Sequence, residues 1–295
     1  MLTTTQNWRN TRTLVTTALL MSVLSGCAPT ALRNETNSIQ EYYRTHDKPD
    51  FQFSQHGVLK LRYLETGDTG KSTVVLIHGT PGSWAFLANY VNDETLQQDA
   101  HLFAIDRPGW GGSTLVDNEF EPGLESQSSL MGDWLCEISA ASPTGKLVLV
   151  GHSLGGTLAP RLAMDHPDCV TAMLILAGPL DPDLASPRWY NQLARIPPLG
   201  WLADVFLGGG MRQSNKEMML LQPELEKMRP LWAELKIPVI VIQGDKDGLV
   251  NPDHADFPGQ ALSTENLKII HLSGEGHFFL YTNKELVMQQ IRSLL

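Results

Sequence analysis

The sequence predicts an α/β fold, with a mostly parallel sheet of eight strands and helices on both faces. Short apolar runs alternate with longer stretches of helical period, and several of the runs are aliphatic at nearly every position. Strands buried on both faces have this continuous aliphatic character, and alternation with helices is typical of a parallel sheet. Polar, glycine-containing motifs directly follow several of the runs, at the sheet edge where ligands bind in this class.

The strands are expected in eight runs, which are 51–54, 58–64, 73–77, 102–105, 147–150, 173–177, 238–242 and 267–271. The first two fit a hairpin that turns near His56 and Gly57. Helical period predicts helices over 84–91, 125–140, 153–166 and 285–295. The order of these elements gives the parallel sheet its connecting helices.

One interval, 181–236, separates two consecutive strands and is too long for a plain crossover. It carries helical stretches between prolines and glycines, together with Trp189, Trp201, Trp232 and several methionines. We interpret it as a helical cap inserted into a core of residues 51–180 and 237–295. Its tryptophans and methionines either line an apolar substrate pocket or form the cap's own core, and the sequence favours neither alternative.

The first 26 residues have the layout of a secretory signal peptide. Arg9 and Arg12 precede an apolar stretch over 14–24, which is followed by small residues. A permanent transmembrane helix is the weaker alternative, because that stretch is well short of the roughly twenty residues needed to span a bilayer. Residues 28–50 are polar and lack apolar periodicity, which is typical of a flexible tether.

Residues 24–27, Leu-Ser-Gly-Cys, resemble the lipobox of bacterial lipoproteins. The resemblance implies that Cys27 becomes the lipidated first residue of the mature protein and anchors it to a membrane of the cell envelope. Ala28 beside it favours the outer membrane if the source has two membranes. An ordinary signal peptide with a chance cysteine is the alternative.

The other two cysteines, Cys136 and Cys169, lie in apolar surroundings. A disulfide between them is possible in an oxidising compartment, but we expect two buried free thiols. The net charge of −10 argues against a nucleic-acid partner. We find no phosphate-binding loop and no clustered metal-ligand spacing, so we expect no cofactor and no metal.

The motif with the clearest chemistry follows the 147–150 strand. Residues 151–156 read Gly-His-Ser-Leu-Gly-Gly and begin a helix. Ser153 is expected on a sharp strand-to-helix turn that exposes its hydroxyl, and the flanking glycines leave room for the tight backbone. The helix amino end and the Leu154 amide can stabilise negative charge beside that hydroxyl.

From about Phe51 to the carboxyl end the chain resembles the α/β-hydrolase family. Three more motifs match in order: His78–Gly82 after the third strand, Asp106–Gly111 after the fourth, and Gly244–Asp247 followed by Gly276–Phe278 near the end. The resemblance implies a serine nucleophile at Ser153, an acid at Asp247 and a histidine base at His277. It also implies a second oxyanion donor in the 78–82 loop, where Thr80 is the natural candidate because Pro81 has no amide hydrogen. The 106–111 turn is expected to shape the site.

Each role follows from what the group can do. Serine is a poor nucleophile at neutral pH, so the imidazole of His277 must take its proton and return it to the leaving group. A carboxylate at Asp247 would hold the far ring nitrogen and stabilise the imidazolium. The amides of Thr80 and Leu154 would then receive the oxyanion.

Other residues have competing interpretations. Asp245 is the nearest rival to Asp247 but is expected to hold the turn, and Asp181 or Asp183 occupy the family's occasional alternative acid position. We expect His152 to be a packing residue and His78 to support the oxyanion loop. His101 and His271 are expected to be structural residues in or beside strands.

The expected function is hydrolysis of a small-molecule carboxylic ester through an acyl-enzyme, at the bacterial cell envelope. The same triad could serve thioester, amide or carbon–carbon bond hydrolysis, or acyl transfer. Haloalkane dehalogenase and epoxide hydrolase chemistry is disfavoured, because those relatives need an aspartate where this chain has Ser153. A non-catalytic envelope lipoprotein that uses the fold to bind a partner is the alternative from another class.

Overall fold

The computed structural model describes residues 44, 49–116, 120–196, 198–199, 210–262 and 265–295. The expected signal peptide, Cys27 and almost all of the expected tether lie outside these residues. No helix among the described residues is both long and apolar enough to cross a membrane.

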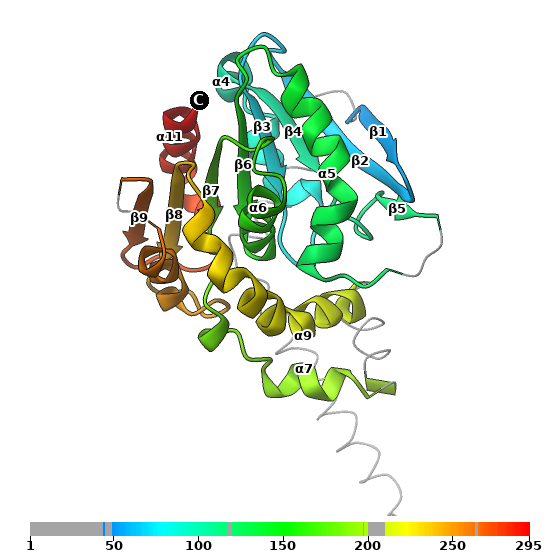
Figure 1. Cartoon of the computed structure of the whole chain (residues 1–295), viewed down its shortest axis with the longest axis vertical. Helices are drawn as coiled ribbons and strands as arrows, with labels where there is room; N and C mark the ends of the chain where they lie inside the picture. The colour runs from blue at the N-terminus through cyan, green and yellow to red at the C-terminus, as the bar shows by residue number, and fades with distance from the viewer. Residues whose placement is uncertain (1–43, 45–48, 117–119, 197, 200–209, 263–264) are drawn as a thin grey trace, which may run out of the picture.

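The strands form one nine-stranded sheet in the order β1-β2-β4-β3-β6-β7-β8-β9, with the short β5 paired to β2 (Figure 1). The bounds are β1 Phe51–His56, β2 Leu59–Gly67, β3 Thr73–Ile77, β4 His101–Ile105, β5 Thr114–Leu115, β6 Leu147–His152, β7 Ala172–Leu176, β8 Val239–Gly244 and β9 Leu267–Leu272. All eight expected strands are present. The ninth, β5, corrects the expected number, and its two residues are too short to produce an apolar pattern.

The helices are η1 Trp84–Leu87, α3 Ala88–Val91, α4 Glu94–Asp99, α5 Leu124–Ala141, α6 Leu154–Asp165, η2 Pro182–Leu184, α7 Trp189–Ala194, α9 Met211–Met228, η3 Arg229–Glu234, η4 Pro252–Gln260, α10 Phe279–Thr282 and α11 Lys284–Leu294. The four expected helices correspond to η1 with α3, and to α5, α6 and α11. The sequence prediction did not include the short α4 or α10.

Strands β3, β4, β6, β7, β8 and β9 pair in parallel, while β1 and β2 form an antiparallel hairpin and β2 pairs antiparallel with β4. In the central register, Ile77 pairs with Gly151 and Gly151 pairs with Ile175. The loops that follow β3, β6 and β7 therefore leave the sheet at one edge, as parallel strands require.

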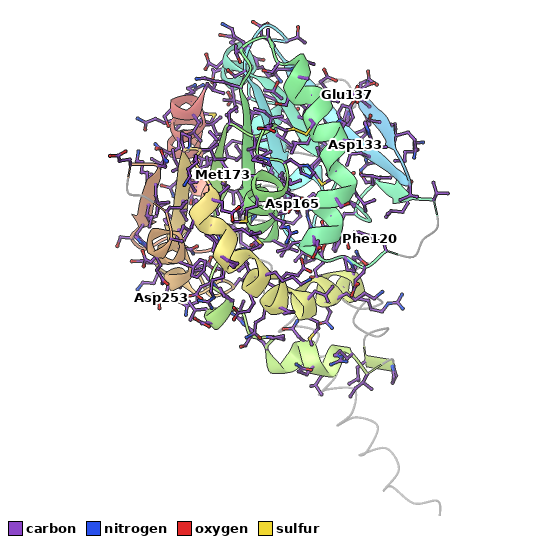
Figure 2. All side chains as sticks on the ribbon, in the orientation of Figure 1. Phe120, Asp133, Glu137, Asp165, Met173 and Asp253 are labelled. Carbon is purple, nitrogen blue, oxygen red and sulfur yellow. A yellow bond between two sulfur atoms is a disulfide. The ribbon has the colours of Figure 1, made fainter. Side chains whose placement is uncertain are left out.

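The sheet separates two apolar cores. One face packs against α5, α6 and the helices around η3, with Trp134 and Leu158 among the buried side chains. The opposite face packs against α3, α4 and α11, with Val91 and Ile291 buried. Charged side chains such as Asp133, Glu137 and Asp253 point outward, whereas Met173 on β7 is buried (Figure 2).

The interval between β7 and β8, residues 181–236, is called the cap segment below. Its described part contains η2, α7, α9 and η3, and α7 and α9 lie beyond one end of the sheet (Figure 1). Helix α9 carries Leu221, Leu225 and Met228 into the core on the α5 and α6 face. The cap segment therefore shares a continuous apolar core with the sheet, and its treatment as a separate domain stays a prediction.

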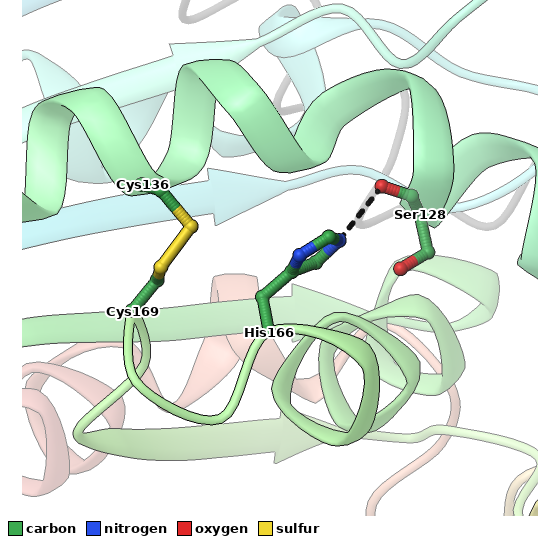
Figure 3. The surroundings of a disulfide bond; sticks show 4 residues. All are labelled: Ser128, Cys136, His166 and Cys169. Carbon is green, nitrogen blue, oxygen red and sulfur yellow. Dashed lines mark hydrogen bonds between the residues drawn. A yellow bond between two sulfur atoms is a disulfide. The ribbon is translucent and has the colours of Figure 1, made fainter.

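Cys136 and Cys169 form a disulfide, so the expectation of free thiols was wrong. Cys136 lies on α5 and Cys169 on the loop after α6, with their Cα atoms 5.0 Å apart. Helices α5 and α6 pack side by side, which brings together two cysteines separated by 33 residues in the sequence (Figure 3). Beside the disulfide, His166 bonds the carbonyl oxygen of Ser128 at 3.2 Å. The packing of two helices depends on tertiary structure, so the local sequence around each cysteine could not predict this disulfide.

Candidate active site

Ser153 occupies the strained turn that the sequence predicts. It lies between β6 and α6 with φ 55° and ψ −124°, a backbone conformation that non-glycine residues seldom adopt. A Cβ on Gly151 would lie 2.1 Å from the carbonyl oxygen of Gly155, and one on Gly155 would lie 2.2 Å from that of Ile77. Both positions therefore require glycine. The turn projects Ser153 into the cavity described below.

Asp247 and His277 form a buried pair. The Nδ1 atom of His277 donates to Oδ2 of Asp247 over 2.7 Å, and both side chains are almost fully buried. The other carboxylate oxygen accepts from the amides of Leu249 and Val250, at 2.8 and 2.9 Å. Gln243 also donates to Oδ2, over 2.9 Å. The carboxylate is thus held from four sides, with the imidazole on one of them.

These bonds keep Asp247 ionised. Burial by itself raises the pKa of this carboxyl group, but the hydrogen bond and charge of His277, together with the Val250 and Leu249 amides, outweigh burial. The pKa of Asp247 therefore lies below its ordinary value. In the neutral ring, donation from Nδ1 to this carboxylate leaves the lone pair on Nε2, the atom that can act as a base.

The other carboxylates considered for the acid role, Asp245, Asp181 and Asp183, bind partners other than His277. Asp245 accepts the amide of Gly274 at 2.7 Å and so holds the turn before His277, as expected. Asp181 caps η2 by accepting the amide of Asp183, and Asp183 pairs with Arg229. Among the described residues, only Asp247 offers a carboxylate to His277.

The loop after β3 runs against the nucleophile turn. A Cβ on Gly79 would lie 2.8 Å from the Cβ of Ser153, so this loop passes close to the serine. Thr80 and Leu154 both line the same cavity as Ser153. Leu154 is the first residue of α6, so its amide has no acceptor within the helix. Both residues that are expected to supply the oxyanion donors therefore line the cavity that holds the serine.

His78 supports this loop as the sequence predicts. Its Nε2 atom accepts the amide of Arg107 at 3.0 Å, so the ring proton is on Nδ1, which donates to the carbonyl oxygen of Gly79 at 2.7 Å. Burial, followed by the charge of Arg107, holds the pKa of His78 well below its ordinary value. The ring is neutral and its tautomer is set by its two partners.

His152 packs beneath the base. Its Nε2 atom donates to the backbone oxygen of His277 at 3.0 Å, and the two rings lie 4.8 Å apart. Burial, followed by the charge of His277, lowers the pKa of His152 to about 3. The geometry fits the expected packing role, because the Nε2 proton is held by a backbone carbonyl and the lowered pKa makes the ring a weak base.

The turn after β4 is built around Asp106, a fully buried carboxylate. It accepts the amides of Trp84 and Gly112, at 2.9 and 2.8 Å, and the Nε atom of Arg62 at 2.6 Å. Gly111 has φ +54°, and a Cβ there would lie 2.2 Å from the carboxylate. None of residues 106–111 lines the cavity described below, so the expectation that this turn shapes the site stays a prediction.

The serine, the histidine and the cap segment enclose one cavity of about 330 Å³. Its apolar lining comes from the core and from the cap segment, and includes Phe86, Phe278, Val250, Leu184, Met218 and Leu221. The sequence left open whether the tryptophans and methionines of the cap segment line the pocket or form a core, and the structure shows both. Met218 lines the cavity, whereas Trp232 and Met228 are fully buried core residues. Trp201 and the side chain of Trp189 lie outside the described part of the chain.

Sequence reasoning missed three charged or titratable side chains near the site, namely Arg107, Glu217 and His254. Arg107 and Glu217 form a buried ion pair at 2.7 Å between the β4 loop and α9. His254 accepts the amides of Leu180 and Asp181 at the start of the cap segment. Arg107 was visible inside the Asp106–Gly111 motif, but the partners of these residues are far away in sequence.

Comparison with known proteins identifies the family. A model of the alpha/beta hydrolase family matches residues 74–289. A poly(3-hydroxyalkanoate) depolymerase of Ectopseudomonas oleovorans is 26% identical over 231 residues, 68% of this chain and 77% of that protein. Three further relatives, named as acyltransferases, are matched over only 25% to 42% of their own length.

Solved structures show the same fold. Cfl2 of Burkholderia cenocepacia gives a TM-score of 0.66 at 18% identity, covering 82% of this chain and 94% of Cfl2. A membrane phospholipase A described as a bacterial virulence factor gives 0.64 at 18% identity, covering 96% of this chain and 97% of that one. The chain belongs to the alpha/beta hydrolase family, and it is an enzyme of the hydrolase type.

Proposed function

We propose that this enzyme hydrolyses carboxylic esters through an acyl-enzyme intermediate. The observation that carries the proposal is the buried Asp247–His277 pair, whose histidine lines one cavity together with Ser153 on its strained turn. Thr80 and Leu154, whose amides we assign to the oxyanion, line the same cavity. This set supplies a nucleophile, a base, an orienting acid and two oxyanion donors.

The reaction divides into two half-reactions. The Nε2 atom of His277 takes the proton of Ser153 as the serine oxygen attacks the ester carbonyl carbon, and the displaced electron pair moves onto the carbonyl oxygen. The Thr80 and Leu154 amides stabilise that oxyanion, each donor contributing roughly 3 to 4 kcal/mol. The pair then re-forms the carbonyl, the alcohol leaves with the proton from His277, and water repeats the sequence to release the acid.

The cavity favours an apolar group on the substrate, because aliphatic and aromatic side chains from both the core and the cap segment line it. The relative from Ectopseudomonas oleovorans is named for depolymerising poly(3-hydroxyalkanoate), whose repeating units are joined by ester bonds. Thioester, amide or carbon–carbon bond hydrolysis and acyl transfer remain alternatives for the same triad. A panel of nitrophenyl esters and thioesters of increasing chain length separates them.

An active-site probe tests the proposal directly. A fluorophosphonate is expected to label the wild-type protein and to leave Ser153→Ala unlabelled, because the probe reacts only with an activated serine. Thr157→Ala is a useful control, since this hydroxyl lies further along α6 and bonds the carbonyl oxygen of Pro179. Folded wild-type protein that takes no label would favour the non-catalytic binding alternative.

We also propose that the protein is lipid-anchored in the bacterial cell envelope through Cys27. The lipobox-like residues 24–27 support this, and so does the Cys136–Cys169 disulfide, because structural disulfides persist in oxidising compartments outside the cytosol. Cys27→Ser is expected to move the protein from the membrane fraction to the soluble fraction. Continued membrane association of this variant would place the anchor elsewhere.

A further inference from the structure

A buried arginine connects the oxyanion loop with the cap segment. Arg107 is fully buried, and its guanidinium donates to two backbone oxygens of the β3 loop: Nε to His78 and Nη2 to Gly79, both at 2.9 Å. On its other side it meets Glu217 of α9, with Nη1 2.7 Å and Nη2 3.3 Å from the two carboxylate oxygens. Nη1 also donates to Gln127 at 2.7 Å.

The contact with Gly79 bears directly on Thr80. The carbonyl oxygen of Gly79 accepts from both Arg107 and His78, so its direction is held by two donors. The peptide bond from Gly79 to Thr80 is trans and planar, which makes the Thr80 N–H point opposite to that oxygen. Holding the oxygen therefore holds the N–H. A charged donor on the oxygen also polarises the peptide and makes its N–H a better donor.

Glu217 holds the arginine in turn. Only 2% of this residue is exposed, and its carboxylate also accepts Nε1 of Trp110 at 2.9 Å and Nε2 of Gln127 at 3.3 Å. All of these donors come from the core, while Glu217 comes from the cap segment. Because both charges of the pair are buried, either one without the other would be strongly unfavourable.

We propose that Arg107 is a positioning residue for the Thr80 oxyanion donor, and that Glu217 makes this positioning depend on the docking of α9 against the core. The inference rests on the proposed function, because it assigns the Thr80 amide to the oxyanion. The cap segment then does more than enclose the cavity. Its docking sets the strength and direction of a donor that acts in the transition state.

Glu224 provides a matched control on the same helix. It is 8% exposed, and it docks α9 to the core by accepting the Glu125 amide at 2.8 Å. It makes no hydrogen bond to the 78–82 loop or to Arg107 among the described residues. Glu224→Ala removes this acceptor, so it loosens the docking of α9 without touching the oxyanion loop.

The experiment compares Glu217→Gln with Glu224→Ala on a nitrophenyl ester that the wild type turns over. In Glu217→Gln the new NH₂ group faces the guanidinium and displaces it, so kcat is expected to fall about tenfold with KM unchanged, a fraction of the effect of losing a whole donor. Glu224→Ala is expected to keep kcat. Because Met218 and Leu221 of α9 line the cavity, a purely structural role for Glu217 would instead raise KM in both variants.

A second variant and a second measurement complete the test. Arg107→Lys keeps the charge but lacks the forked geometry needed to reach both loop oxygens and Glu217, so kcat should fall roughly a hundredfold. In ¹⁵N-labelled protein, the Thr80 amide resonance should shift in Arg107→Lys and Glu217→Gln but stay in place in Glu224→Ala. An unmoved Thr80 resonance in the first two would overturn the inference. If the wild type turns over no ester, the proposed function fails. The Thr80 amide resonance still tests whether Arg107 and Glu217 position that amide.

Discussion

Loops at the strand ends form one wall of the cavity and the cap segment forms the other. The residues that support these two walls are held in different ways. On the strand-end wall, Asp247 is bound by amides two and three residues further along the chain. On the cap wall, Glu217 reaches Arg107 across 110 positions and Glu224 reaches the Glu125 amide across 99. The catalytic carboxylate is thus fixed largely by short-range backbone bonds, whereas the polar contacts of the cap segment are long-range and add to the apolar packing of α9. Changes to the first wall should act on catalysis directly. Changes to the second should act on stability and, through the Glu217–Arg107 pair, on catalysis indirectly.

The sharpest test of this contrast lies within one turn. Asp247→Asn should lower kcat by about 10⁴, because a neutral amide no longer sets the His277 tautomer or stabilises the imidazolium. Asp245→Asn should change kcat little, since its carboxylate only accepts the Gly274 amide and an asparagine oxygen can do the same. Steady-state kinetics on one ester measures both variants, and equal losses would contradict the assignment of the acid.

The disulfide offers a test on the core, away from both walls. Replacing Cys136 and Cys169 by serine should lower the free energy of unfolding by about 3 to 4 kcal/mol, as expected for a cross-link that closes a loop of this length. Neither cysteine lines the cavity, so kcat should stay at the wild-type value. Urea unfolding with and without a reductant measures the loss. If a reductant still lowers the free energy of unfolding of the double variant, the loss in the wild type is not due to this disulfide.

Per pH unit, the smallest expected effect concerns the start of the cap segment and its response to acid. Burial lowers the pKa of His254 to about 4, against the opposing charges of Asp181, Asp247 and Asp253. The unfolded chain takes up this proton near pH 6.5, so between pH 6.5 and about 4 it binds more protons than the folded chain. Stability should therefore decline as the pH falls through this range, by up to about 1.4 kcal/mol per pH unit from this residue.

His254→Asn isolates that contribution. The asparagine oxygen can accept the Leu180 and Asp181 amides in place of Nδ1, yet it does not titrate. The unfolding free energy of this variant, measured by urea titration from pH 7 to pH 4, should depend less steeply on pH than that of the wild type. Parallel curves for the two proteins would show that His254 does not carry the acid sensitivity.

The expectations that agreed with the structure share a local cause. Aliphatic runs bounded by turns predicted the strands, and the glycines around Ser153 predicted a turn that only those residues permit. Asp247 could be preferred over Asp245 only by resemblance to the family, and the structure gives the reason, since the two point to different partners. The lipidation of Cys27 and the catalytic roles themselves stay predictions.

What the sequence by itself determined is the class of fold, the order of its motifs and the chemistry that each motif can offer, because these depend on backbone sterics and on periodicity over a few residues. The tertiary structure alone decided that Cys136 meets Cys169, that β5 joins the sheet, and that Arg107 meets Glu217. These contacts join segments that are distant in sequence, and their partners are chosen by how helices and strands pack, which no local pattern records.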